Sequence, residues 1–314
     1  MNLRGLDITR ILTIVVVALF VLVVGQQVLF MVIGDKTAAA QEDLGSLQGQ
    51  VAEAQTQNQQ LTTQLSDKTL EWRNAQGRLS FNGDGTGKVC YLTFDDGPSK
   101  TLTPKNLEIL KEKGAVGTWF CLGDAEEFPY LDLSLCKHIE EQGNAVGIHD
   151  WAQDDSYSYY KGDVENYFTS DFDKTKQVLE EAVGHEIKIC RFAGGSPTIR
   201  YYNSKIGKTL PQEIIKRGYQ YFDWNVLAGD SEPSQFVNGH TPKDTIVDNV
   251  LSAAEKYAKT NSPICVLMHD NPGKDTTTEA LPEIIDGLKE LGYTFSTLSY
   301  DSPGFYQTSI IEES

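Results

Sequence analysis

Two adjacent carboxylates, Asp95 and Asp96, follow an apolar segment and stand directly before Gly97-Pro98 in the stretch YLTFDDGP. Neighbouring carboxylates repel each other unless a proton, a metal ion or a basic side chain shares their charge. Because the Gly-Pro pair turns the chain, both acids are expected at the carboxyl end of a strand. That end of a strand is where α/β proteins place their chemistry.

Other strand-like segments also run into polar residues that can take part in chemistry. They are His149 in GIHDWAQDD, Arg191 in CRFAGGS, Asp223 and Trp224 in FDWNVLAGD, and His269 in VLMHD. Taken singly, such a histidine is more often a structural hydrogen-bonding group, and such an arginine often only neutralises acids. Their recurrence at the ends of successive strands favours a functional site, because strands that surround one axis would bring these side chains to one mouth.

Beyond residue 88, short apolar segments alternate with amphipathic segments. The strand candidates are 89–94, 115–120, 145–148, 187–192, 219–222, 264–268 and 293–296. The helix candidates are 104–113, 133–142, 164–183, 211–217, 243–259 and 277–291. This alternation predicts a parallel sheet covered by helices, and seven strands suit an incomplete barrel as well as an open sheet.

The segments TFDDGP, HDWAQ, RFAGGS, DWNVLAGD and VLMHD resemble, in this order, the five motifs of the polysaccharide deacetylase family. This family is also known as the NodB-homology domain or carbohydrate esterase family 4. The resemblance covers residues 89 to about 298. It implies an α/β fold, a distorted (β/α)7 barrel. The implied activity is metal-dependent hydrolysis of N-acetyl groups from a cell-wall polysaccharide, with N-acetylglucosamine of peptidoglycan as the expected substrate and another acyl group or polymer as an alternative.

The resemblance also implies a role for each matched residue. Asp96 and His149 look like ligands of a divalent cation, with zinc expected and manganese or cobalt as alternatives. Asp95 looks like the general base, held ionised by Arg191. His269 looks like the acid that protonates the departing amine, with Asp223 tuning it. The expected acetyl pocket is lined by Trp224, Gly194 and Gly195.

The sequence departs from the family pattern in the second motif, where Gln153 stands in place of a second histidine. A neutral amide oxygen is a poor zinc ligand, so the third ligand is left open. The candidates are Gln153, Asp154, Asp150, Asp155 and, more remotely, His240. An alternative function follows from this departure, namely a catalytically weakened glycan-binding scaffold or sensor. In the third motif, Gly194 occupies a position where many family members carry an aromatic residue.

The amino-terminal part predicts a membrane anchor. Residues 11–33 carry no charge and are long enough to span a bilayer, and Arg4 and Arg10 precede them. This arrangement predicts a cytoplasmic segment at 1–10 and a single-pass protein of the cell membrane with an extracytoplasmic catalytic domain. The rival interpretation is a cleaved signal peptide, for which TAAAQ at 37–41 offers small residues.

A helical stalk is predicted between the anchor and the catalytic domain. A heptad pattern fits 44–79, so that residues 41–80 read as a coiled-coil-like stalk through which the chain could form a homodimer. Residues 81–88 read as a glycine-rich linker, 89–300 as the polysaccharide deacetylase domain and 301–314 as a tail.

The composition bears on the class of binding partner and on the state of the cysteines. A net charge of −17 and the absence of a basic stripe argue against nucleic acid as a partner. The family resemblance implies an N-acetylated glycan as the partner, peptidoglycan above all. The chain has five cysteines, an odd number, so at least one thiol stays unpaired. Cys90, Cys190 and Cys265 lie in apolar strand-like segments, which predicts buried free thiols.

Overall fold

The computed structural model describes residues 13–21, 23–24, 37–82, 87–152 and 157–310. The chain divides into two compact units, Met1–Lys68 and Thr69–Ser314. Most of the predicted anchor at 11–33 lies outside the described residues. Among the residues that are described, no helix combines the length and apolar character needed to cross a membrane.

A helix of 46 residues, α2 (Thr37–Asn82), covers the segment for which a helical stalk is predicted. Its first part belongs to the amino-terminal unit, and its last turns belong to the second unit. In these turns Leu70 and Arg73 are buried, and the Arg73 guanidinium lies 4.3 Å from the ring centre of Tyr300. Asn74 accepts a hydrogen bond from the backbone N–H of Ile310. The predicted helix is confirmed, while its role as a stalk and its self-association stay predictions.

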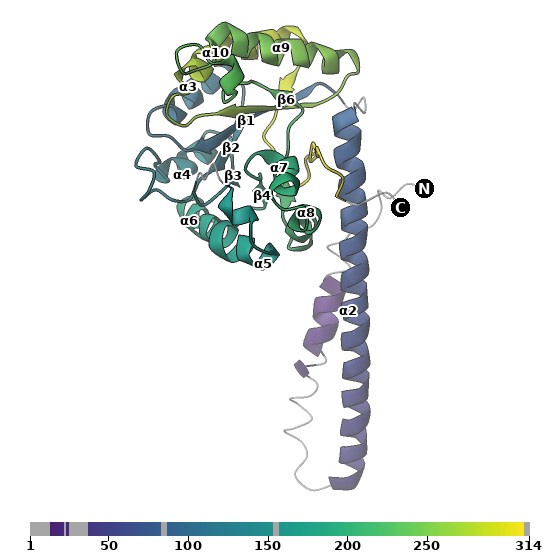
Figure 1. The fold of residues 1–314 in the computed structure, drawn as a ribbon. Helices are drawn as coiled ribbons and strands as arrows, with labels where there is room; N and C mark the ends of the chain where they lie inside the picture. The colour runs from purple at the N-terminus through teal and green to yellow at the C-terminus, as the bar shows by residue number, and fades with distance from the viewer. Residues whose placement is uncertain (1–12, 22, 25–36, 83–86, 153–156, 311–314) are drawn as a thin grey trace. The chain divides into compact units, whose positions relative to one another are not determined.

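The second unit is built on one parallel sheet of eight strands (Figure 1). The strands are β1 (Val89–Gly97), β2 (Gly117–Cys121), β3 (Ala145–Ile148), β4 (Ile189–Cys190), β5 (Gln220–Tyr221), β6 (Val226–Leu227), β7 (Ile264–His269) and β8 (Thr294–Phe295). Their order is β5-β4-β3-β2-β1-β7-β6, and β8 also pairs with β1. The sheet is therefore a half-barrel whose end strands are β5 and β6. The predicted parallel sheet is confirmed, but β6 is an additional strand inside the fourth motif.

Helices connect the strands and cover the sheet (Figure 1). They are α3 (Thr103–Lys113), α4 (Ser134–Glu141), α5 (Val164–Tyr167), α6 (Asp173–Val183), α7 (Gly195–Tyr202), α8 (Ile206–Lys216), α9 (Lys243–Lys259) and α10 (Asp275–Glu290). A π-helical turn, Phe168–Phe172, joins α5 to α6. Helix α7 is absent from the sequence-based prediction, because Gly194, Gly195 and Pro197 mark a loop by their types. Proline is nevertheless tolerated in a first helical turn, where its missing N–H has no partner to lose.

The core lies between the sheet and its helices and contains every described cysteine as a buried free thiol. The prediction of buried free thiols is thus confirmed. Alternate residues of β1 point to opposite sides of the sheet. Phe94 packs against Trp119, with ring centres 4.5 Å apart, whereas Thr93 and Asp95 both contact Arg191. One side of β1 therefore supports the fold, and the other side carries the polar site.

Candidate active site

A β-bulge explains how two consecutive carboxylates reach the same site. Consecutive strand residues normally point to opposite faces, which would send Asp96 to the same side as Phe94. The register between β1 and β2 shifts between Asp95 and Gly97, and Asp96 adopts a left-handed backbone conformation with φ of 67°. A bulge of this kind re-aims a side chain. As a result, Asp95 Oδ2 and Asp96 Oδ1 lie 3.8 and 3.5 Å from Nε2 of His149.

His149 follows β3 directly, and its ring is oriented from the neighbouring strand. Its Nδ1 lies 2.8 Å from the backbone carbonyl of Arg191. A carbonyl only accepts, so Nδ1 carries the proton, and Nε2 of the neutral ring presents a lone pair to Asp95 and Asp96. Three electron-rich atoms facing one another require a cation or a proton between them.

Arg191 is fully buried immediately after β4 and holds Asp95 in place. One of its terminal nitrogens donates to Asp95 Oδ1 at 2.8 Å and to the Thr93 hydroxyl at 2.6 Å. Its other nitrogens donate to the carbonyls of Phe222 and Asp223. Burial lowers the pKa of this guanidinium, but the charge and hydrogen bond of Asp95 together with other nearby charges raise it. The predicted juxtaposition of Arg191 and Asp95 is therefore present, and it fixes the orientation of the carboxylate.

His269 stands at the end of β7, in register with Asp95 on β1. Its Nδ1 lies 2.9 Å from Asp230 Oδ1, and its backbone N–H donates to Asp230 Oδ2 at 2.8 Å. Burial disfavours the imidazolium, but the charge and hydrogen bond of Asp230, together with the charges of Asp96 and Asp95, raise the pKa of His269 to about 9. At neutral pH this ring is protonated and can donate its proton.

The expectation that Asp223 tunes His269 was wrong, because Asp230 occupies that place. Asp223 instead accepts the backbone N–H and the hydroxyl of Ser196, at 2.8 and 2.6 Å, and the N–H of Gln307. Its carboxylate is fully buried and anchors the first turn of α7. Burial raises the pKa of Asp223 against these hydrogen bonds. Asp230 closes the quoted fourth motif, so the signal that could have identified it was present seven residues downstream.

The predicted pocket residues Trp224, Gly194 and Gly195 lie beside one another. Gly195 has φ of +78°, and a Cβ at this position would meet the Trp224 ring at 2.9 Å and Asp223 Oδ1 at 3.2 Å. Gly194 has φ of +67° and approaches Thr198, whose hydroxyl donates to its carbonyl at 2.7 Å. Gly194 and Gly195 therefore form a turn that brings the backbone close to Trp224, where many family members carry an aromatic residue at the position of Gly194.

We expect Gly195→Ala to impair both folding and the pocket. Alanine in the left-handed region and a methyl group against Trp224 should together lower the free energy of unfolding by about 1–3 kcal/mol. Displacement of the Trp224 ring should also lower kcat/KM for acetate release. Gly218→Ala is the matched control, since Gly218 has φ of +87° with open space around its Cβ position. Equal losses of activity in the two variants would contradict the steric role of Gly195.

The donor set fits a divalent cation in part. A carboxylate oxygen and an imidazole nitrogen, brought to 3.5 Å in Asp96 and His149, match the ligand types of zinc and related metals. Among the described residues, however, no group of three or more His, Cys, Asp or Glu is arranged to hold a metal. Asp150 thus gains no support as a third ligand, and His240 lies on an exposed loop. Gln153, Asp154 and Asp155 lie outside the described residues.

Asp270, which follows His269, is a buried acid that the sequence-based prediction did not assign. Its Oδ2 accepts hydrogen bonds from the Trp119 ring N–H at 2.8 Å and from the Thr103 hydroxyl. Burial raises the pKa of Asp270 to about 7. A Cβ on Gly97 would collide with Asp270 Oδ1, so this acid packs directly under the turn that follows Asp96.

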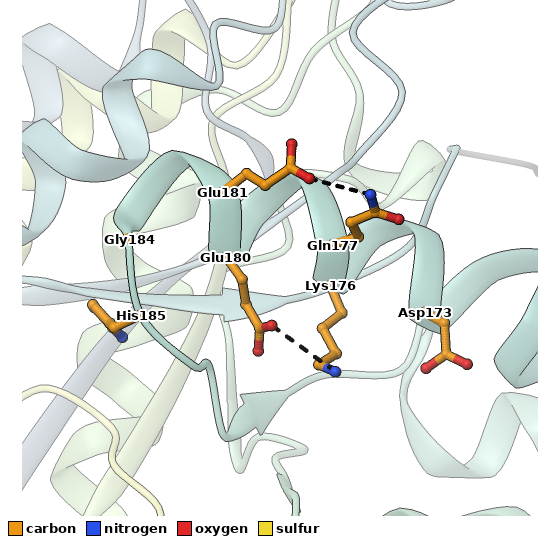
Figure 2. Close-up of a pocket in the computed structure, with 7 residues that line it drawn as sticks. All are labelled: Asp173, Lys176, Gln177, Glu180, Glu181, Gly184 and His185. Atoms are coloured by element: carbon orange, nitrogen blue, oxygen red, sulfur yellow. Dashed lines mark hydrogen bonds and ion pairs between the residues drawn. The ribbon is translucent and has the colours of Figure 1, made fainter.

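A hollow of about 740 Å³ lies elsewhere, along α6 and the turn after it (Figure 2). Its lining residues are Asp173, Lys176, Gln177, Glu180, Glu181, Gly184 and His185. Figure 2 shows Gln177 hydrogen bonded to Glu181 and Lys176 paired with Glu180. None of the residues at the strand ends lines this hollow, so we do not connect it with the chemistry described above.

Comparison with known proteins places this arrangement in a family. The family model described as polysaccharide deacetylase matches residues 82–220. A putative polysaccharide deacetylase of Bacillus subtilis is 30% identical over 216 residues, which are 67% of this chain and 67% of that protein. The chain belongs to the polysaccharide deacetylase family. The family resemblance and the enzyme class predicted from the sequence are thereby confirmed.

Other members of the polysaccharide deacetylase family are similar along most of the chain. A peptidoglycan-N-acetylglucosamine deacetylase of Bacillus cereus is 28% identical over 256 residues, covering 80% of this chain and 84% of the relative. The catalytic domain of a peptidoglycan N-acetylglucosamine deacetylase from Eubacterium rectale superposes with a TM-score of 0.60 at 28% identity, covering 71% of this chain and 93% of that domain. A polysaccharide deacetylase of Bacillus cereus gives 0.55 at 26% identity, covering 71% of this chain and all of that one.

Proposed function

We propose that this deacetylase hydrolyses the N-acetyl group of N-acetylglucosamine units in peptidoglycan with the help of a divalent cation. The observation that carries the proposal is the meeting of Asp95, Asp96 and His149 at the carboxyl end of the sheet, with Nε2 of His149 facing both carboxylates. The substrate class is supported by the relatives from Bacillus cereus and Eubacterium rectale, which carry peptidoglycan deacetylase names.

Asp96 and His149 are the residues that would hold the cation, with zinc as the first candidate and manganese or cobalt as alternatives. A bound divalent cation supplies a Lewis acid for the acetyl carbonyl and makes a water easier to deprotonate. The buried setting matters as well, since burial raises the pKa of Asp96 and the charge of His269 acts against this rise. A positive charge beside Asp96 would therefore favour its ionised form.

The residues around this pair perform the proton transfers. Asp95, oriented by Arg191, takes a proton from the water that attacks the acetyl carbon. His269 gives its proton to the amine nitrogen as the C–N bond breaks, and Asp230 holds the ring in position for this step. The products are acetate and a free amine on the sugar. Opposite tasks for two neighbouring carboxylates account for their adjacency in the sequence.

We also propose that residues 11–33 anchor the protein in the cell membrane and that the stalk carries the domain outside it. The support for this proposal is the uncharged length of 11–33 and the arginines before it. Coiled-coil pairing of the stalk would yield a homodimer. Sedimentation of residues 37–314 in an analytical ultracentrifuge would test this.

The decisive experiment measures acetate release from N-acetylglucosamine oligomers and from peptidoglycan. The chelated protein is supplied in turn with zinc, cobalt and manganese. The proposal expects acetate release that depends on added metal. If none of these metals supports acetate release while the glycan is still bound, the alternative of a weakened glycan-binding scaffold, suggested by Gln153, replaces the enzyme.

A further inference from the structure

Helices α7 and α8 present a basic and aromatic surface in an otherwise acidic protein. This α7–α8 surface consists of Arg200, Tyr201, Tyr202, Lys205 and Lys208, all of which are exposed. Tyr201 is 83% exposed, which is unusual for so large an apolar ring. Residues 187–212 contain no Asp or Glu, although the whole chain has a net charge of −17. Such a local concentration of positive charge favours a negatively charged ligand.

Helices α7 and α8 lie side by side (Figure 1) and make a close backbone contact. A Cβ on Gly207 of α8 would lie 2.5 Å from Cα of Arg200, so glycine permits α8 to approach the last turn of α7. Ile206 and Leu210 point into the core, whereas Lys205 and Lys208 stay on the outer side. The arginine, the tyrosines and the lysines are therefore exposed on two helices that contact each other.

Helix α7 connects the predicted pocket residues with the α7–α8 surface. Helix α7 begins at Gly195, which packs against Trp224, and its eight residues extend about 12 Å at 1.5 Å per residue. A series of contacting tyrosine rings joins Tyr201 to the buried Tyr160. Tyr201 contacts Tyr202 with ring centres 5.2 Å apart, Tyr202 contacts Tyr157 at 4.8 Å, and Tyr157 stacks on Tyr160 at 6.0 Å.

The inner end of this ring series is attached to the polar site. The Tyr160 hydroxyl donates to the carbonyl of Ala193, two residues after Arg191. Two described acids of α5 and α8 are paired with other cations, since Glu165 contacts Arg217 and Glu213 contacts Lys216.

We propose that the α7–α8 surface is a subsite for the part of a carboxylate-bearing N-acetylhexosamine strand that extends beyond the reacting sugar. The exposed Tyr201 ring would pack against the C–H face of a sugar, as amphipathic aromatic side chains do at binding surfaces. Arg200 and Lys205 would pair with the carboxylates that a peptidoglycan strand carries. This inference rests on the proposed function and specifies that the preferred substrate is a long, anionic strand.

The test measures binding of the full chain to two soluble probes by calorimetry. One probe is a set of peptidoglycan glycan strands freed of teichoic acid, and the other is the neutral hexamer of N-acetylglucosamine. Tyr201→Ala should weaken binding of both probes by about threefold to tenfold, the range typical of one aromatic packing contact. Tyr201→Phe keeps the ring and should bind both probes as the parent protein does.

Charge reversal separates the electrostatic part of the subsite. The double variant Arg200→Glu, Lys205→Glu should weaken the binding of the anionic strands more than the binding of the neutral hexamer. This difference in binding should shrink at 1 M salt, where charges are screened within about 3 Å. The double variant Lys256→Glu, Lys259→Glu on α9 makes the same charge change on exposed residues elsewhere and should have no such selectivity.

The subsite proposal would be overturned if Tyr201→Ala bound both probes as tightly as the parent protein. It would also be overturned if the two charge-reversed proteins showed the same selectivity between the anionic strands and the neutral hexamer. Stronger competition by purified teichoic acid than by teichoic acid-free strands would overturn the choice of a glycan strand as the occupant. Binding is measured without turnover, so failure of the subsite is distinguishable from failure of the deacetylase assignment. A protein that binds strands through this surface but releases no acetate would refute only the latter.

Discussion

Replacement of Asp95 by asparagine is expected to lower acetate release by about a thousandfold at saturating metal, the middle of the range for removal of a general base. Asparagine has nearly the same shape and can still accept a hydrogen bond from Arg191, but it cannot take a proton. The positions of Asp96 and His149 depend on the bulge and on the Arg191 carbonyl, so the metal affinity should change much less than the rate.

Stability must be measured beside activity for this variant, because Arg191 is fully buried and pairs with Asp95. Loss of one member of a buried charge pair costs up to about 3–5 kcal/mol, and the retained hydrogen bond should reduce that cost. Asp248→Asn, an exposed change on α9, is the control for the loss of one carboxylate. A folded Asp95→Asn protein with parental kcat would refute the assignment of Asp95 as the base.

Replacement of Asp230 by asparagine is expected to shift the alkaline limb of the pH profile of kcat/KM to lower pH. His269 must be protonated to act as the acid, and its pKa of about 9 is maintained by Asp230 against burial. If the pKa returns to its ordinary value of 6.5, the protonated fraction at pH 8.5 and the rate should fall by about a hundredfold. At pH 6 the loss should be much smaller, because the ring is then protonated in both proteins.

The same substitution should change how stability depends on pH. His269 binds its proton more tightly in the folded chain than in the unfolded chain, so this stabilisation is complete below pH 6.5 and is lost as the pH rises through about 9. For the parent protein this loss should amount to roughly 3 kcal/mol of unfolding free energy. Urea unfolding at pH 6 and pH 9.5 should show a smaller decline in Asp230→Asn.

Asp244→Asn, an exposed change at the start of α9, serves as the control in both measurements. An unchanged alkaline limb in Asp230→Asn would mean that His269 does not supply the proton or that Asp230 does not set its protonation. An unchanged pH dependence of stability, with the limb displaced, would show that the limb belongs to another group.

The sequence alone determined the strand-helix alternation and most of the site. Apolar strand segments bounded by polar residues are local patterns, and they identified Asp95, His149, Arg191 and His269 without any knowledge of distances. The parallel sheet then brings the carboxyl ends of its strands to one edge, as the pattern predicts. The prediction of the parallel sheet succeeded because burial periodicity is a property of neighbouring residues, while the roles of the site residues stay predictions.

Only the tertiary structure decided how these residues work together. The bulge that aims both Asp95 and Asp96 at His149 depends on the register of β1 against β2, which no local pattern encodes. The choice of Asp230 over Asp223 as the partner of His269 depends on β6, a strand of two residues paired with β7. Such short pairings carry no periodic signal, and backbone hydrogen bonds across the sheet determine which of two nearby acids reaches the histidine.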